Sequence, residues 1–172
     1  MMELPAPTGP LFFSGGLLRP WELSDAPALL AAWQDDAIAR FNAVPSDPSL
    51  DLATRWISGT EERQAKGLAI DFVIEQDHPS RRAGEVGLSG FNSDGTGALV
   101  GYWLIAAARG SGVATAAVSA LTDWAFEVLE LEVLVARCDP ANRASQRVAE
   151  RCNFTHESHD PHGKQLWRKR TK

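Results

Sequence analysis

The stretch that most constrains the fold is Ala108–Val118, a glycine-rich turn that leads directly into a long helix with one apolar face. Apolar side chains recur from Val113 onwards at intervals close to the helical period of about 3.6 residues. The first N–H groups of a helix have no partner inside it, and with the helix dipole they form an anion site. Gly110 and Gly112 let the backbone approach that anion, and Arg109 can bind a phosphate through two hydrogen bonds. The pattern therefore predicts a pyrophosphate site.

Two familiar phosphate motifs do not fit this stretch. A P-loop would place a Lys-Ser or Lys-Thr pair after the glycines, and a dinucleotide fingerprint would need a different glycine spacing. The pattern that fits is Arg-x-x-Gly-x-Ala, formed by Arg109, Gly112 and Ala114. This hexad resembles the coenzyme A pyrophosphate loop of the GNAT N-acetyltransferase superfamily. A glycine-rich helix start that binds no ligand is the alternative.

The segments around the loop strengthen this resemblance. "GYWL" at Gly101–Leu104 is similar to the strand that precedes the loop, and Leu131–Asp139 indicates a short buried strand. A helix over Asn142–Phe154 resembles the Asn-x-x-Ser helix of the branch that includes ribosomal-protein and small-molecule N-acetyltransferases. The resemblance covers Gly84–Glu157 and is thinner over Leu17–Trp33, which looks like the opening strand and first helix of the family.

The order of the expected elements predicts an α/β protein with a mixed central sheet and helices on both faces. This is also the order of the GNAT fold, whose fourth and fifth strands splay apart to open a slot for pantetheine. By resemblance these are Gly101–Ala106 and Val133–Cys138. We expect a flexible lead-in over residues 1–10 and a single N-acetyltransferase domain over residues 11–172. The expected strands are 17–21, 68–76, 85–91, 98–105, 131–139 and two within 155–170, and the expected helices are 24–34, 52–66, 113–128 and 142–154.

Composition excludes several classes of function. The chain has 172 residues, of which 44% are hydrophobic, and this is enough for one domain with its own core. The net charge of -5 argues against nucleic-acid binding. No apolar run is long enough for a membrane helix and no signal peptide is apparent, so we expect a cytoplasmic protein away from the membrane. Cys138 and Cys152 do not make a disulfide framework. A homodimer is an open alternative to a monomer.

The resemblance implies acetyl-CoA as the acetyl donor and a primary amine as the acceptor. The thioester would lie beside Leu104 and Ile105, whose backbone groups can hydrogen-bond pantetheine and polarise the acetyl carbonyl. The other residues expected to bind the donor lie in the loop and at the start of the following helix. They are Arg109, Gly110, Ser111, Gly112, Val113, Ala114 and Asn142.

Two positions where relatives carry catalytic groups are apolar in this chain. The usual base position holds Leu99, and the position of the usual tyrosine acid holds Ala149. The resemblance instead implies Glu157 as the base, with Glu85 a weaker option and water a third, and Ser145 as the donor to the leaving thiolate. A thiol has a pKa of about 8.5, so a weak donor suffices. The structural alternatives are an exposed carboxylate for Glu157 and helix capping for Ser145.

The missing base affects which amine is the acceptor. An α-amine has a pKa of about 7.7–8.0, whereas a lysine amine, at about 10.4, loses its proton near neutral pH at a cost of about 4 kcal/mol. We therefore expect an acetyl-CoA-dependent N-acetyltransferase acting on a protein or peptide N-terminus. An acetyltransferase for antibiotic or polyamine amines, or a non-catalytic acyl-CoA-binding module, are the alternatives.

The acceptor is expected at the opposite end of the slot from the coenzyme. Trp33 and Phe41, together with Trp56, are candidates to line its site, although tryptophans at helical spacing also serve as core residues. The cluster of His156, His159, Asp160 and His162 lies in a Pro-Gly turn and lacks the His-Glu-x-x-His arrangement. We therefore expect no metal.

Overall fold

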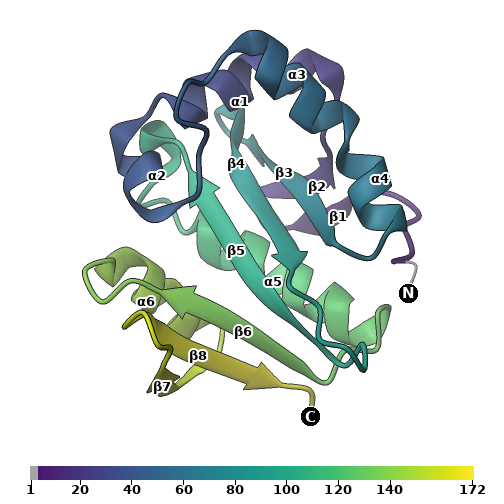
Figure 1. Ribbon diagram of the computed structural model, residues 1–172, viewed down its shortest axis with the longest axis vertical. Coiled ribbons are helices and arrows are strands. Elements are labelled where there is room, and N and C mark those ends of the chain that lie inside the picture. Colours follow the sequence, from purple (N-terminus) through teal and green to yellow (C-terminus); the bar gives the residue numbers. More distant parts are fainter. Residues whose placement is uncertain (1–3) are drawn as a thin grey trace.

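Alternating apolar side chains assemble eight strands into one mixed sheet, which helices cover on both faces (Figure 1). This computed structural model describes residues 4–172. The strands are β1 (Leu11–Phe13), β2 (Gly16–Pro20), β3 (Ala69–Asp77), β4 (Ser80–Ser89), β5 (Gly97–Leu104), β6 (Val133–Cys138), β7 (Thr155–His159) and β8 (Gln165–Arg170). The helices are α1 (Ala26–Trp33), α2 (Asp36–Phe41), α3 (Leu50–Ser58), α4 (Thr60–Ala65), α5 (Val113–Glu127) and α6 (Arg143–Arg151), with 3-10 turns at Leu23–Asp25 and Ala106–Ala108.

The strand order is β1-β2-β3-β4-β5-β6-β8-β7, with β5 and β6 parallel and the other neighbours antiparallel. Helix α5 makes the crossover between the parallel strands. Their pairing runs only from Gly97 opposite Val133 to Val100 opposite Ala136, although β5 continues to Leu104. The two strands then diverge, as Figure 1 shows. The predicted fold and its splayed strands are confirmed; β1 shifts the numbering of the pair from fourth and fifth to β5 and β6.

Alternation along the strands divides the core into two parts. One face of the sheet packs against α5, where the rings of Phe72 and Trp124 meet edge to face with centroids 5.8 Å apart. The other face carries Val73, which packs with Trp21 and Trp33 beneath α1 and α3. The second part of the core is smaller and rich in tryptophan, and it borders the cavity described below.

The helical segments differ from the sequence prediction in two places. The helix expected over residues 52–66 is two helices, because the run Ser58-Gly59-Thr60 has poor helix propensity and α3 ends there. The helix expected to start at Ser24 begins instead with a 3-10 turn, whose capping box joins Glu22 and Asp25. Asp25 is fully buried and also accepts hydrogen bonds from two arginines, so tertiary contacts fix this start. The structure adds α2 and β1, which no periodicity indicated.

The described part of the expected lead-in packs onto the domain without forming a helix or strand. Leu4 is buried, and its carbonyl accepts a hydrogen bond from Gln64 Nε2 at 3.2 Å. Residues 1–3 of that expected segment lie outside the described residues. Across residues 4–172, none of the helices has the length and apolar character needed to cross a membrane.

Candidate active site

The start of α5 has the geometry that the glycine-rich loop predicts. Gly110 and Gly112 have φ values of +74° and +81°, a left-handed backbone that favours glycine. A Cβ added at either position would meet no atom within 4 Å, so both open onto free space. The N–H of Ala116 donates to Gly112 O at 3.1 Å, which leaves the N–H groups of the three preceding helical residues without a partner inside the helix. This open, donor-rich end fits a pyrophosphate.

Arg109 connects this loop to the end of β5. Its Nε and Nη2 donate to Leu104 O at 3.2 and 3.0 Å, and Nη2 lies 3.5 Å from Asp35 Oδ2. The Ile105 N–H donates to Ala83 O at 2.9 Å, so alternation along β5 turns the backbone groups of Leu104 toward the opening beside β6. Ser111 Oγ donates to Ala108 O at 2.7 Å and closes the turn.

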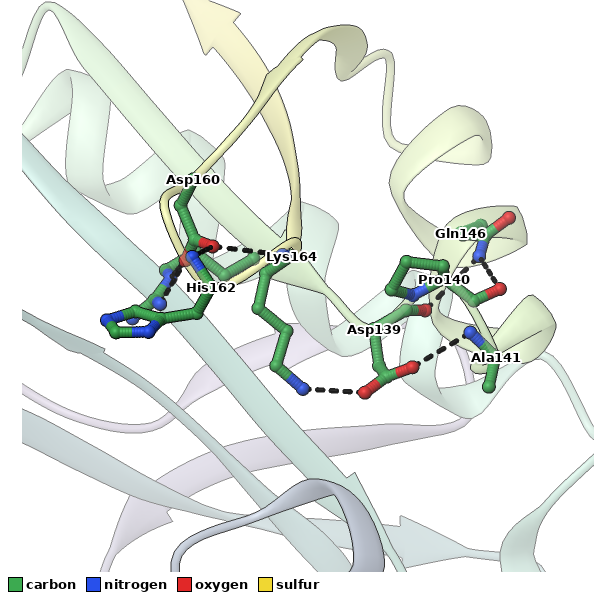
Figure 2. Close-up of polar contacts among 8 residues, drawn as sticks. Asp139, Pro140, Ala141, Gln146, Asp160, His162 and Lys164 are labelled. Atoms are coloured by element: carbon green, nitrogen blue, oxygen red, sulfur yellow. Dashed lines mark hydrogen bonds and ion pairs between the residues drawn. The ribbon is translucent and has the colours of Figure 1, made fainter.

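A network of hydrogen bonds holds the turn between β6 and α6 (Figure 2). Lys164 Nζ donates to Asp139 Oδ2 at 2.6 Å, and Gln146 Nε2 donates to the carbonyls of Asp139 and Pro140 at 3.2 and 2.9 Å. The turn places Asn142 at the N-cap of α6, where its Oδ1 accepts the Ser145 N–H at 3.1 Å. Asn142 and Ser145 are therefore positioned just after the end of β6, where β5 and β6 diverge.

Ser145 belongs to a cluster of neutral proton donors beside the gap. Its Oγ lies 3.4 Å from Cys138 Sγ at the end of β6. Tyr102 on β5 also interacts with it: burial raises the pKa of Tyr102 to about 12, and a hydrogen bond with Ser145 opposes the rise. Burial raises the pKa of Cys138 as well. No sequence motif indicated Tyr102, although its alternation with Gly101 and Trp103 along β5 would have placed it on the face of α5 and α6.

On the opposite face of the sheet, a cavity of about 450 Å³ lies between the strands and the N-terminal helices. Its helical side includes Trp33 and Trp56, and its sheet side includes two acidic residues, Asp71 and Glu85. Trp33 and Trp56 line this cavity, and their contact with the acceptor stays a prediction. Phe41 is not among the lining residues; its ring lies 4.9 Å from the Arg40 guanidinium, and the segment that follows it lines the cavity. The full lining is Leu29, Trp33, Asn42, Ala43, Val44, Pro45, Trp56, Asp71, Glu85, Gly87, Leu88, Ser89, Gly101, Tyr102 and Trp103.

Glu85 has the surroundings of a general base. Trp103 Nε1 donates to its Oε1 at 3.2 Å, while its Oε2 is buried without a hydrogen-bond partner. Burial, followed by the charge of Asp71, raises the pKa of Glu85 to about 8, although nearby indoles and Arg63 oppose the rise. A carboxylate with a raised pKa in the wall of a cavity can take a proton near neutral pH.

Arg63 on α4 balances part of this negative charge. Its Nη2 lies 3.6 Å from Asp71 Oδ2, its Nη1 donates to Trp56 O at 3.1 Å, and its guanidinium lies 4.3 Å from the centroid of the Trp56 ring. Burial raises the pKa of Asp71 and Arg63 lowers it. Arg63 therefore fixes Trp56 and Asp71 relative to each other.

Glu157 lies elsewhere. It is on β7 and accepts hydrogen bonds from Arg170 at 2.8 Å and Arg168 at 2.5 Å, and the Arg170 contact is the main cause that lowers its pKa. Strands β8 and β6 separate β7 from β5, a distance of three strand spacings or roughly 14 Å. The structure does not bring Glu157 together with Ser145 or with the cavity, and its arginines make it a weaker proton acceptor.

The histidine cluster also stays apart from the cavity. The rings of His156 and His159 are 5.0 Å apart, and His156 also packs on Trp167. In the part of the chain that the structure describes, no three His, Cys, Asp or Glu side chains gather to hold a metal ion. The expectation of a metal-free protein stays a prediction.

A mixed sheet that opens between two parallel strands, beside a glycine-rich helix start, defines the class of the acetyltransferases. The sequence model of the acetyltransferase (GNAT) domain matches residues 17–155, and the chain belongs to this family. Probable N-acetyltransferase YjcK from Bacillus subtilis is 30% identical over 142 residues, which are 80% of this chain and 78% of that protein. The protein is an acyltransferase of the N-acetyltransferase type, as the sequence predicted.

Solved structures with the same fold include two complexes with the coenzyme. The ribosomal L7/L12 alpha-N-protein acetyltransferase RimL, in complex with coenzyme A, has a TM-score of 0.82 and 20% identity, with 94% of this chain and 98% of that chain covered. The microcin C7 self-immunity acetyltransferase MccE, in complex with acetyl-CoA and AMP, has a TM-score of 0.77 and 21% identity, with 91% and 93% covered. At these identities the likeness shows the fold.

Proposed function

We propose that this protein transfers the acetyl group of acetyl-CoA to the α-amine of a peptide or protein N-terminus, with Glu85 as the base. The observation that carries the proposal is the position of Glu85, a carboxyl group with a raised pKa that lines the cavity and accepts a hydrogen bond from Trp103 Nε1 of β5 at 3.2 Å.

The donor half of the site follows from the elements around the gap between β5 and β6. The open N–H groups of α5 and the guanidinium of Arg109 would hold the pyrophosphate of acetyl-CoA. The N–H of Leu104, whose carbonyl accepts from Arg109, would bind pantetheine at the opening, and Asn142 would contribute from the start of α6. The fit rests on Gly110 and Gly112, whose missing side chains leave the approach clear.

The reaction forms a C–N bond and breaks a C–S bond. Glu85 accepts one proton from the ammonium of the acceptor, and the neutral nitrogen then attacks the thioester carbonyl. The thiolate leaves with a hydrogen bond from Ser145, which Tyr102 supports from β5. As the C–S bond breaks, the nitrogen loses its second proton and the thiolate takes it up, at a thiol pKa of about 8.5, so the products are an amide and a thiol with the first proton left on Glu85. Each group needs only modest acidity or basicity.

The pKa of the acceptor amine favours an N-terminus. An α-amine at about 7.7–8.0 is matched to a base whose own pKa is about 8, so proton transfer between them is nearly balanced in energy. A lysine amine at about 10.4 would hold its proton more tightly than Glu85. The name of RimL, ribosomal L7/L12 alpha-N-protein acetyltransferase, is consistent with this choice.

Thiol release from acetyl-CoA, measured with a panel of amines, tests the proposal. We expect release with short peptides that have a free N-terminus, and none when the same peptides are N-terminally blocked but carry a free lysine side chain. Faster release with an amino sugar or a polyamine would assign the protein to small-molecule acetylation. Binding of acetyl-CoA without release with any amine would contradict the proposal and favour a non-catalytic binding module.

A further inference from the structure

The cavity has two chemically different walls. The side that the N-terminal helices build is apolar and aromatic, with Leu29, Trp33 and Trp56. The side that the sheet builds carries Asp71 on β3 and Glu85 on β4. Val73, two residues after Asp71, pairs with Glu85 in the antiparallel register, so the side chains of Asp71 and Glu85 lie on the same face of the sheet. A ligand that satisfies both walls has a charged end and an apolar group close to it.

The charges around the cavity leave room for one cation. Arg63 lies behind Asp71 and Glu85 and pairs with Asp71, with its Nη2 3.6 Å from Asp71 Oδ2, so Glu85 is the carboxyl group of this wall that has no cation beside it. When Glu85 loses its proton, a single ammonium neutralises the one negative charge that remains. A second ammonium would find no second unpaired carboxylate in this wall, and a carboxylate would meet like charge.

Two glycines open the sheet side of this cavity. Gly87 on β4 pairs directly with Gly101 on β5, and both line the cavity. A Cβ on Gly87 would lie 2.8 Å from Asp71 Oδ1 and 2.7 Å from Ile70 O, so this glycine is required by the neighbouring strand. A Cβ on Gly101 would meet no atom within 4 Å. The fold does not need a glycine at position 101, but the open space of the cavity does.

We propose that the cavity selects a primary amine with one positive charge and a bulky apolar group on the carbon beside the nitrogen, and that Gly101 sets the size of that group. For a peptide acceptor this means a large apolar first residue. The proposal rests on the proposed function, because it names the acceptor of the same site. The ammonium lies at Glu85, and the apolar group lies between Gly101 and the tryptophans of the helical wall.

The first test compares tetrapeptides that differ only in their first residue. We expect kcat/KM for norleucine-first and leucine-first peptides to exceed that of a glycine-first peptide at least tenfold, since each buried methylene contributes to discrimination. Lysine-first peptides form a matched pair with norleucine-first peptides, with similar length and one more charge. Their α-acetylation is expected to be at least tenfold slower.

The second test changes the size of the cavity. Gly101→Val should lower kcat/KM for the norleucine-first peptide at least tenfold. Gly101→Ala should lower it by a smaller factor. The glycine-first peptide should change by no more than about threefold. Leu99→Val alters the same strand and face outside the cavity and should leave the ratio between the two peptides unchanged. Melting temperatures show that the variants are folded.

The outcomes separate the two proposals. Equal rates for norleucine-first and glycine-first peptides, or a Gly101→Ala variant that slows both equally, would overturn the selection by size while acetylation still supports the proposed function. A lysine-first peptide as fast as its norleucine partner would overturn the single-charge rule. Absence of acetylation with every peptide would overturn both proposals.

Discussion

At the scale of single residues, the site depends on a few side chains whose surroundings set their acidity. Glu85 is buried next to Asp71, and this raises the pKa at which it gives up its proton. Glu157 lies between two arginines, and this lowers its pKa. The two glutamates therefore have pKa values shifted in opposite directions. Glu85 faces a cavity with too little positive charge, whereas Glu157 has two cations beside it.

Ser145 offers a residue-scale prediction in which stability and catalysis separate. Its backbone N–H, and not its hydroxyl, donates to the capping oxygen of Asn142. Ser145→Ala should keep the helix cap and the melting temperature, and should lower kcat by about tenfold, because the thiolate already leaves well and a positioned donor adds little. Steady-state kinetics with a saturating peptide give the readout. An unchanged kcat would leave Ser145 with a structural role alone.

Tyr102→Phe is the companion to that variant. We expect a loss of kcat no larger than that of Ser145→Ala, because Tyr102 supports the serine from β5 and donates through it. The double variant should be no slower than the slower single variant, since residues that act as one unit are not additive. Additive losses would contradict a shared role.

At the scale of elements, the end of β5 and the start of α5 form the part that binds the donor. Arg109 is held by Leu104 O and approaches Asp35, so a phosphate competes with these contacts for the guanidinium. Arg109→Gln should weaken coenzyme A binding about tenfold, because a hydrogen bond to a charged group contributes about 1.5–3 kcal/mol. Arg55→Gln, an exposed change on α3, is the control. Calorimetry with coenzyme A measures both.

Asp35→Asn tests the same contact from the side of the carboxylate that lies near Arg109. Asparagine keeps a side-chain oxygen for the N-cap of α2, where Asp35 Oδ1 accepts the Ala37 N–H at 2.8 Å. The change removes the charge that competes for Arg109. Coenzyme A affinity should stay the same or rise. A fall comparable to that of Arg109→Gln would mean that Asp35 positions the arginine for the phosphate.

The elements also show which parts of the fold the sequence could predict. The loop at 108–118 and the cap at Asn142 are local patterns, because a glycine at positive φ and a capping side chain act within one turn. The cavity is not local. Its base acquires its properties from Asp71 on the neighbouring strand and from a tryptophan wall on separate helices, and no spacing along the chain encodes those distances. Glu157 and Glu85 both lie within the segment Gly84–Glu157 that carries the resemblance, and the burial that raises the pKa of Glu85 cannot be seen in the sequence.

At the scale of the whole molecule, one buried charge network joins the N-terminal helices to the sheet. Asp25, at the start of α1, accepts hydrogen bonds from Arg19 of β2 at 2.7 Å and from Arg82 of β4. Burial raises the pKa of Asp25, but the hydrogen bonds from Arg19, the Glu22 N–H and Arg82 together lower it to about 2. The network holds the helical wall of the cavity against its sheet.

The network predicts how stability depends on pH. The pKa of Asp25 is lower in the folded state than its usual value near 4, so its contribution is complete above about pH 4 and is lost as the pH falls toward 2. The shift corresponds to about 2 kcal/mol. Asp25→Asn should lower the free energy of unfolding at pH 7 by at least that amount, because it leaves two arginines without a carboxylate.

Urea denaturation at pH 7 and at pH 2.5 measures this effect. The difference between wild type and Asp25→Asn should be large at pH 7 and much smaller at pH 2.5, where the aspartate is largely protonated in the unfolded state and partly in the folded state. Asp51→Asn, which removes an exposed ion pair with Arg55 on α3, should change stability by less than about 0.5 kcal/mol at either pH. Equal effects at both pH values would contradict the assigned role of Asp25.

The role of Glu85 as the group that accepts the proton of the amine can be measured from the pH dependence of kcat/KM. In the wild type, kcat/KM for a peptide should rise with pH up to about 8, as Glu85 and the amine lose their protons. Glu85→Gln should lower it by about 10²-fold or more and remove the contribution of Glu85 to that rise, while Glu157→Gln stays within about twofold of the wild type. Near-normal turnover in Glu85→Gln, with a large loss in Glu157→Gln, would contradict the account.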